Sequence, residues 1–192
     1  MVKKKNSHLW DRHPEDFYVE PHWCSRRLFQ SETFEGMIHD PACGRGRILA
    51  EAVKSGYPAY GSDLVARRGA GGVRNFLDSS VMYDNIVCNP PFGLCSKHPY
   101  PFVAHAILHT RRKLALLLPL VWAGGAKRSV FLRETPLSKI LVLAPRPSMP
   151  PGPVIEAGIA PGGGKKDYAW FIWDKVGLPE SPRFGWLVRD ER

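Results

Sequence analysis

The sequence has few cysteines, and their spacing does not suit a metal site. Its four cysteines include no C-x-x-C pair and no histidine at metal-ligand intervals, which argues against a zinc centre. We expect reduced thiols in a cytoplasmic protein. No apolar run follows the lysines at 3–5, so no secretory signal is predicted. The longest apolar run, 114–123, is interrupted by Pro119 and is too short for a membrane span. We therefore expect neither a metal nor a membrane partner.

Acidic residues are scarce relative to basic ones. The chain has 27 Lys and Arg against 18 Asp and Glu, which gives a formal net charge of +9. Neutralisation of phosphates drives nonspecific nucleic-acid binding, so this excess favours a polyanionic partner. The alternative is that the charge serves solubility alone.

Length and composition predict one globular domain. The 192 residues, 44% of them hydrophobic, can bury one substantial core. Residues 1–15 are polar, basic and aperiodic and are predicted to form a flexible arm, which leaves 16–192 as the domain. The Pro- and Gly-rich stretch 145–166 is too long for an ordinary connection, and we interpret it as an insertion that is either functional or disordered.

Strand-like and helix-like segments alternate along the chain. Helices are expected from Pro21, after Gly46 and around 102–107, with Arg111, Arg112 and Lys113 at the end of the last one. Strands are expected at 37–39, 59–62, 73–77, 85–88, 114–118, 139–143 and 168–173. This order predicts a doubly wound α/β sheet.

The segment 40–46, Asp-Pro-Ala-Cys-Gly-Arg-Gly, lies between a predicted strand and a predicted helix. Gly44 and Gly46 allow the backbone to approach a ligand closely, and the helix N-terminus offers free N–H donors. Ligands of open α/β sheets bind outside the carboxyl ends of the strands. The side chains predicted at those ends are Asp40, Asp63, Asp78 and Asn89.

Two of these acids suit a nucleoside. A carboxylate at the second strand end can accept from both hydroxyls of a ribose, and Asp78 can accept from an adenine amino group. Both acids could instead be turn or capping residues. The dinucleotide fingerprint G-x-G-x-x-G is incomplete because Leu49 occupies the third glycine position, which leaves a nicotinamide oxidoreductase as a weaker alternative.

Asn89-Pro90-Pro91-Phe92 follows the predicted strand 85–88. The Asn89 amide oxygen and the Pro90 carbonyl can accept the two hydrogens of an exocyclic amine, which frees the nitrogen lone pair for attack on a methyl donor. Rigid Pro-Pro geometry keeps both acceptors in place. Phe92 can stack on a flipped base. Taken alone, Asn-Pro-Pro could also be an ordinary turn.

In this order and spacing, the two motifs resemble those of S-adenosylmethionine-dependent methyltransferases that modify amino nitrogens of nucleobases. The resemblance covers about residues 16 to 174, and segment 16–21 is similar to the one that closes over the methionine part of the cofactor in that family. It implies a Rossmann-like class I methyltransferase fold, mostly parallel with an antiparallel last strand. Glu20 stands where the family often has Thr.

The resemblance also assigns residues to roles. It implies that S-adenosylmethionine is bound by Tyr18, Glu20, Asp40, Ala42, Cys43, Gly44, Gly46, Asp63, Leu64, Leu77, Asp78 and Asn89. The catalytic residues would be Asn89, Pro90, Pro91 and Phe92. We expect Arg146, Lys165 and Lys166 to line a groove for nucleic-acid phosphates, with a solvated loop as the alternative.

The expected function is methyl transfer to the N6 of adenine in DNA, as in small phage or prophage members of the family. The Phe that follows Asn-Pro-Pro favours DNA, while an RNA-base, protein-glutamine or cytosine-N4 methyltransferase stays open. A noncatalytic nucleic-acid-binding module is a further alternative. Family members that choose a sequence usually carry an added recognition domain, so we expect recognition from the insertion, the arm or a second subunit. A homodimer therefore stays open.

Overall fold

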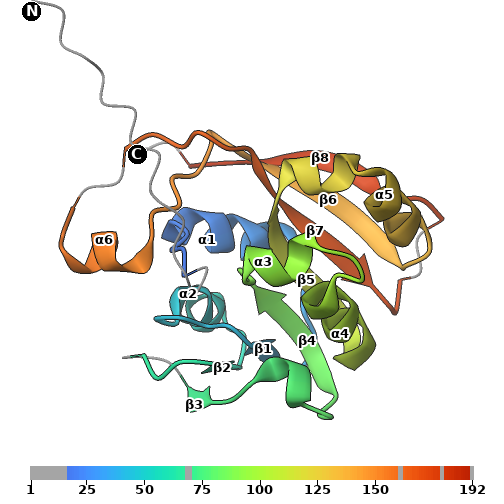
Figure 1. Cartoon of the computed structure of the whole chain (residues 1–192), viewed down its shortest axis with the longest axis horizontal. Coiled ribbons are helices and arrows are strands. Elements are labelled where there is room, and N and C mark those ends of the chain that lie inside the picture. Colours follow the sequence, from blue (N-terminus) through green and yellow to red (C-terminus); the bar gives the residue numbers. More distant parts are fainter. Residues whose placement is uncertain (1–16, 68–70, 160–161, 178–179, 191–192) are drawn as a thin grey trace, which may run out of the picture.

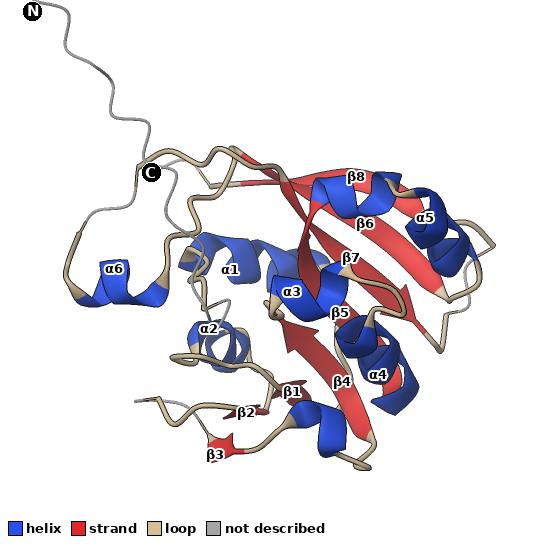
Figure 2. Cartoon of the chain, in the orientation of Figure 1, coloured by secondary structure: helices blue, strands red, loops and turns tan. Residues whose placement is uncertain are grey.

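The computed structural model describes residues 17–67, 71–159, 162–177 and 180–190, and in these residues the chain forms one sheet with helices on both faces (Figures 1 and 2). The predicted arm, 1–15, lies outside the described residues. The strands are β1 Ile38–Asp40, β2 Ala59–Asp63, β3 Gly72–Val73, β4 Tyr83–Cys88, β5 Thr110–Pro119, β6 Leu137–Ala144, β7 Tyr168–Asp174 and β8 Arg183–Val188. The α-helices are α1 His22–Ser31, α2 Arg47–Lys54, α3 Phe92–Ser96, α4 Pro101–His109, α5 Ala126–Arg133 and α6 Gly152–Glu156, and two 3-10 turns are η1 Phe76–Asp78 and η2 Leu120–Gly124. None of the described helices is long and apolar enough to cross a bilayer.

The described strands are ordered β3-β2-β1-β4-β5-β7-β6-β8. All neighbouring pairs are parallel except those of β7, which runs antiparallel to β5 and to β6. The strand order turns around between β1 and β4, and in open α/β sheets such a switch point is where ligands bind. The carboxyl ends of β1, β2 and β4 therefore meet at one edge of the sheet.

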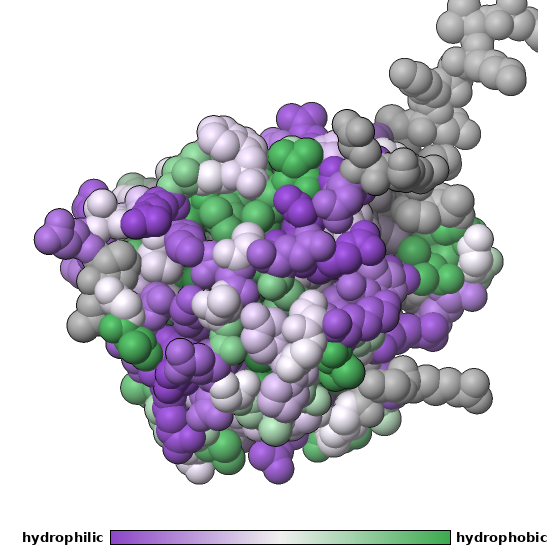
Figure 3. All heavy atoms as spheres, turned by 180° about the vertical axis from the view of Figure 1, so that it is seen from behind, coloured by the Kyte–Doolittle hydropathy of each residue, from purple (hydrophilic) through white to green (hydrophobic). Residues whose placement is uncertain are grey.

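Each face of the sheet has its own hydrophobic cluster. α1 and α2 cover one face, while α4, η1 and α5 cover the other. The central strand β5 supplies both, because Leu114, Leu116 and Leu118 belong to one cluster and Ala115 and Leu117 to the other. All five are fully buried, which confirms the prediction that this apolar run is a strand covered on both faces. Seen from behind, the surface mixes hydrophilic and smaller hydrophobic areas (Figure 3).

The prediction for Arg111, Arg112 and Lys113 is wrong, because these residues lie in β5. Helix α4 ends at His109, and Thr110 already has extended backbone. The three cations instead pair with acids at the amino end of the sheet. Arg111 faces Asp84, Arg112 contacts Glu35, and Lys113 lies near Glu32 and Asp174.

The third strand is shorter than predicted, and its C-terminal part is a turn. Only Gly72–Val73 pairs with β2, whereas Phe76–Asp78 forms η1. The Asn75 side chain accepts a hydrogen bond from the Leu77 N–H at 3.2 Å, which starts the turn. Asp78 therefore does not end a strand.

Helix α5 and strand β8 are among the elements that were not predicted. Helix α5 has a single buried residue, Leu132, so its sequence shows little apolar periodicity. Strand β8 pairs in parallel with β6 and follows β7, so the antiparallel strand is not the last one. Its Phe184 and Trp186 are exposed, and only Leu187 is buried.

Candidate active site

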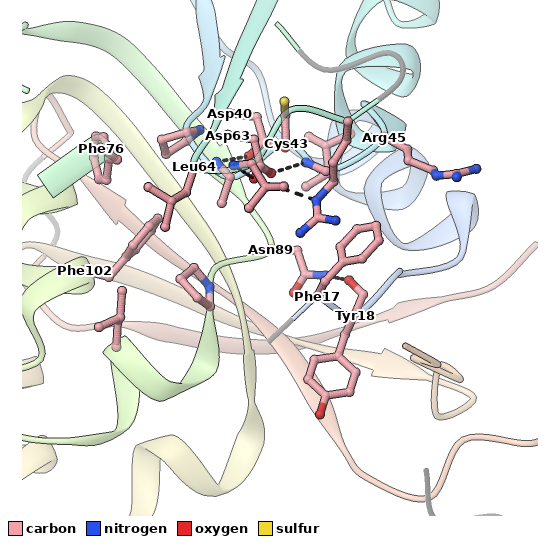
Figure 4. A pocket seen from close by; sticks show the side chains of 18 of the residues that line it. Phe17, Tyr18, Asp40, Cys43, Arg45, Asp63, Leu64, Phe76, Asn89 and Phe102 are labelled. Carbon is pink, nitrogen blue, oxygen red and sulfur yellow. Dashed lines mark hydrogen bonds and ion pairs between the residues drawn. The ribbon is translucent and has the colours of Figure 1, made fainter. Parts of the chain in front are cut away.

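A cavity of about 490 Å³ opens at the carboxyl ends of β1, β2 and β4, a volume typical of ligand pockets (Figure 4). Figure 4 shows Leu64 and Phe102 at one side and Phe17, Tyr18 and Asn89 at the other. Of the residues predicted for the site, the cavity is lined by Tyr18, Glu20, Asp40, Ala42, Cys43, Gly44, Asp63, Leu64, Leu77, Asn89 and Pro91. The predicted residues outside its lining are Gly46, Asp78, Pro90, Phe92, Arg146, Lys165 and Lys166.

The turn from β1 into α2 depends on two glycines. Gly44 has φ +53° and Gly46 has φ +75°, a region that side chains with a Cβ adopt rarely. A Cβ at Gly44 would also lie 2.9 Å from Cε2 of Phe17. Gly44 thus serves both the turn and the close approach of segment 17–20, while Gly46 caps the helix.

Asp63, the last residue of β2, holds this turn from the neighbouring strand. One carboxylate oxygen accepts from the Gly44 N–H at 2.8 Å, and the other accepts from the Val65 N–H at 3.0 Å. The Arg67 guanidinium lies 3.9 Å away. Asp63 is therefore a buried acid at the cavity wall, with carboxylate lone pairs left beyond these two bonds.

Asp40, at the end of β1, is buried, and desolvation raises its pKa to about 8. The nearby Glu20 and Asp63 carboxyls act in the same direction, while hydrogen bonds from the Cys88 thiol and the Ala42 N–H oppose the rise. Burial also raises the pKa of Glu20 above its ordinary value. The cavity thus gathers three carboxyl groups in a poorly solvated place, although the described residues include no cluster that could hold a metal ion.

Asn89 follows β4 directly, and its amide is fixed on one side. Its Nδ2 donates to the Tyr18 carbonyl at 3.0 Å and to Oε2 of Glu20 at 2.8 Å. Its Oδ1 is buried and accepts no hydrogen bond from the described residues. The oxygen predicted to receive an amine is therefore the atom that still lacks a donor. Sequence reasoning missed the contact between Glu20 and Asn89.

An aromatic group surrounds the start of α3. The Phe92 ring stacks on the Tyr18 ring, with centroids 6.0 Å apart. The Phe92 ring also contacts the Tyr168 ring, with centroids 5.8 Å apart. Burial raises the pKa of Tyr168 to about 12, so it stays neutral. Tyr168 was not predicted for the site. Its position follows from the register of β7, which sets it opposite Pro119 at the carboxyl end of β5.

The insertion 145–166 lies against the same site. The Val19 N–H donates to the Pro150 carbonyl, and the Gly152 N–H donates to the Phe17 carbonyl, each at 3.0 Å. Glu156 of α6 forms a 2.6 Å ion pair with Arg45 of the glycine turn. Phe17 is thus enclosed between the insertion and the turn, a contact that the sequence pattern did not predict.

The residues predicted to bind nucleic acid lie on the surface near the ends of the insertion. Arg146 forms a bidentate ion pair with Asp167, in which Nε and Nη2 donate to the two carboxylate oxygens at 2.7 and 3.3 Å. Lys165 and Lys166 are exposed. The structure does not bring these cations to the cavity, and a role in phosphate binding stays a prediction.

Comparison by sequence matches no family model and no curated protein. Comparison by structure finds the M protein of the type I restriction enzyme EcoKI, with a TM-score of 0.58 and 18% identity over 85% of this chain and 45% of that protein. A modification subunit of a putative type I restriction enzyme from Vibrio vulnificus YJ016 matches with a TM-score of 0.56 and 14% identity, over 91% and 48%. A putative RNA methyltransferase from Pyrococcus horikoshii matches with a TM-score of 0.55 and 13% identity, over 81% of each chain.

The chain has a Rossmann-like methyltransferase fold. The predicted fold class is thereby confirmed, with β8 as an addition at the edge of the sheet. The chain spans about half the length of the two restriction-modification proteins. In open α/β sheets, ligands bind outside the carboxyl ends of the strands, and the cavity lies at such ends of β1, β2 and β4.

Proposed function

We propose that this protein transfers a methyl group from S-adenosylmethionine to an exocyclic amine of a nucleobase, with the N6 of adenine in DNA as the acceptor. The observation that carries the proposal is the Asn89 amide, whose two N–H groups are engaged while its buried oxygen lacks a donor. Leaving a buried acceptor unpaired costs about 1–3 kcal/mol. A substrate amine that donates to this oxygen would recover that cost.

Two acids at the strand ends support S-adenosylmethionine over a nicotinamide dinucleotide. Asp40 and Asp63 line the cavity, and of the four lining arginines Arg45 pairs with Glu156, Arg47 donates to the Glu20 carbonyl and Arg67 lies 3.9 Å from Asp63. A sulfonium and an ammonium group would favour the ionised forms of these two acids. A pyrophosphate would add negative charge instead.

The residues present fit such a cofactor. Asp63 would accept from the ribose hydroxyls with the lone pairs that Gly44 and Val65 leave free, and the half-buried Leu77 and exposed Leu64 would flank the adenine. The backbone of Gly44 permits close approach. When bound, S-adenosylmethionine supplies an electrophilic methyl group. Asp78 has no place in this set, because its exposed carboxylate accepts from Asn75 and does not line the cavity.

On the substrate side, Oδ1 of Asn89 and the carbonyl of Pro90 would accept the two amine hydrogens. Two acceptors favour a pyramidal nitrogen, whose lone pair is then available for attack. Phe92 belongs to the aromatic group with Tyr18 and Tyr168, and we propose this group as the surface on which the flipped base stacks. Stacking of one base contributes about 1–3 kcal/mol.

The choice of DNA rests on two supports. The net charge of +9 suits a nucleic acid, and Phe92 in place of Tyr favours DNA adenine. Structural neighbours are described as restriction-modification proteins and as a putative RNA methyltransferase, so an RNA base is the second candidate. Protein glutamine and cytosine N4 would use the same acceptor atoms.

A substrate panel with labelled methyl donor tests the proposal. Duplex DNA, single-stranded DNA, RNA and protein are offered in parallel, and products are mapped at base resolution. We expect N6-methyladenine in DNA. Label found only in RNA or protein would overturn the DNA assignment, and calorimetric binding of NAD without binding of S-adenosylmethionine would overturn the proposal as a whole.

The Asn89→Ala variant tests the central residue. We expect turnover to fall at least a hundredfold, the usual effect of removing one fixed polar group that stabilises a transition state. Affinity for S-adenosylmethionine, measured by calorimetry, should stay within a few-fold because Oδ1 faces the acceptor. A variant that kept most of its activity would contradict the role of the amide.

A further inference from the structure

The Asn89 amide can adopt two orientations related by a half-turn about its last side-chain bond, and only one of them serves the proposed reaction. In the observed orientation, Nδ2 faces the Tyr18 carbonyl and Glu20, and Oδ1 is turned away from both. After a half-turn, Oδ1 would face two acceptor oxygens. The NH₂ group would then point toward the substrate amine, so that donors would oppose each other.

Glu20 is held firmly enough to impose this choice. The residue is 6% exposed, and its carbonyl accepts from Arg47 at 3.0 Å. The residue before it, Val19, is anchored by its N–H to the Pro150 carbonyl. Figure 4 shows Tyr18 directly beside the Asn89 amide. Both acceptors therefore come from one short segment that lies 69 to 71 positions from Asn89 in the sequence.

We infer that Glu20, together with the main-chain carbonyl of Tyr18, sets the orientation of the Asn89 amide so that its oxygen faces the substrate amine. The inference rests on the proposed function, and it gives Glu20 the role of a positioning residue. The resemblance to known methyltransferases suggested a cofactor contact instead. The two roles predict different kinetics, because a positioning residue affects kcat and a cofactor contact affects the affinity for S-adenosylmethionine.

The first experiment compares Glu20→Leu with Glu20→Gln. Leucine removes the acceptor at similar volume, whereas the Gln oxygen can still accept from Asn89. We expect Glu20→Leu to lower kcat at least tenfold with cofactor affinity within threefold of the wild type, and Glu20→Gln to stay within threefold in both. If Glu20→Gln falls as far as Glu20→Leu, or if cofactor affinity falls in step with kcat, the inference is overturned.

The second experiment exchanges donor and acceptor. In Asn89→Asp, an acid would face Glu20 in place of the amide NH₂ group, so the donor that orients the side chain is lost and activity should fall. In the double variant Asn89→Asp with Glu20→Gln, the Gln NH₂ can donate to the Asp carboxylate and leave its other oxygen for the amine. We expect the double variant to be at least tenfold more active than Asn89→Asp. Equal activity of the two would count against the inference.

A third measurement does not depend on turnover. In the ¹⁵N-labelled protein, the Asn89 NH₂ signal is identified by its absence in Asn89→Asp, and we expect its protons to exchange slowly with water. Protection should be lost in Glu20→Leu and kept in Glu20→Gln. Rapid exchange in the wild type would refute the inference even if methyl transfer is found. Slow exchange in a protein that methylates no substrate of the panel would instead refute the proposed function and leave the orientation of the amide supported.

Discussion

Binding of S-adenosylmethionine should release a proton from Asp40. Burial raises the pKa of Asp40 to about 8, so most molecules carry a neutral carboxyl group at pH 7. A cationic ligand favours the ionised form, because the opposite charge replaces the solvation that burial has removed. The proton therefore leaves as the cofactor enters.

The size of the effect follows from the pKa. At pH 6 about one molecule in a hundred has an ionised Asp40, and at pH 7 about one in ten, if the pKa is about 8. The apparent Kd should thus fall about tenfold from pH 6 to pH 7, or about 1.4 kcal/mol. About 0.9 proton should be released per cofactor bound at pH 7. An α-amino group has a pKa of about 7.7–8.0, so the cofactor's own ammonium stays charged over this range.

Isothermal titration calorimetry from pH 6 to pH 7, in buffers that differ in ionisation enthalpy, measures both quantities. The Asp40→Asn variant cannot ionise, so its Kd should not change with pH and its proton release should vanish. The Glu20→Gln variant serves as the control and should retain most of the slope, because desolvation, more than the Glu20 charge, raises the pKa of Asp40. The reasoning fails if the wild type binds equally well at pH 6 and pH 7, or if Asp40→Asn retains the slope.

Two further substitutions test the glycine turn and the contact between the insertion and Phe17. Asp63→Ala should weaken cofactor binding in calorimetry and destabilise the fold by about 1–3 kcal/mol, because the Gly44 N–H loses its acceptor; unchanged binding would contradict the role of Asp63 at the cavity. Gly152→Ala should lower the free energy of unfolding by about 1–3 kcal/mol in urea denaturation, because its Cβ would lie 1.7 Å from Cε1 of Phe17. The matched control is Gly162→Ala, whose Cβ would have no neighbour within 4 Å, and equal stability of the two variants would show that the contact with Phe17 is not tight.

The central strands could be predicted because their sequences reflect burial directly. The leucine-rich run 114–118 must be apolar at every position, since alternate side chains enter the clusters on opposite faces of the sheet. Strand β8 lacks that signal. It lies at the sheet edge, pairs with one neighbour and exposes Phe184 and Trp186, so its backbone hydrogen bonds to β6 define it more than its side chains do.

The residues of the site also divide into those that local sequence places correctly and those that it does not. Asp40, Asp63 and Asn89 could be placed because each lies at or just after the end of a strand, and strand ends are set by local sequence. Asp78 was misplaced because the Asn75 side chain starts a turn where a strand was expected. Tyr168 was missed because its neighbours depend on strand register, which no short stretch of sequence specifies.

Segment 17–20 combines a local signal with long-range contacts. Its sequence resembles a cofactor-closing segment, whereas its partners lie far away in the sequence. Phe17 packs against the glycine turn and the insertion, whereas Glu20 contacts the Asn89 amide. We propose that this one segment both covers the cavity and orients Asn89, through residues only three positions apart. A change at Phe17 should act mainly on cofactor affinity and a change at Glu20 mainly on kcat, because the side chains meet different partners. On this proposal, closure over the cofactor and orientation of the amide are separate tasks of two residues in one segment.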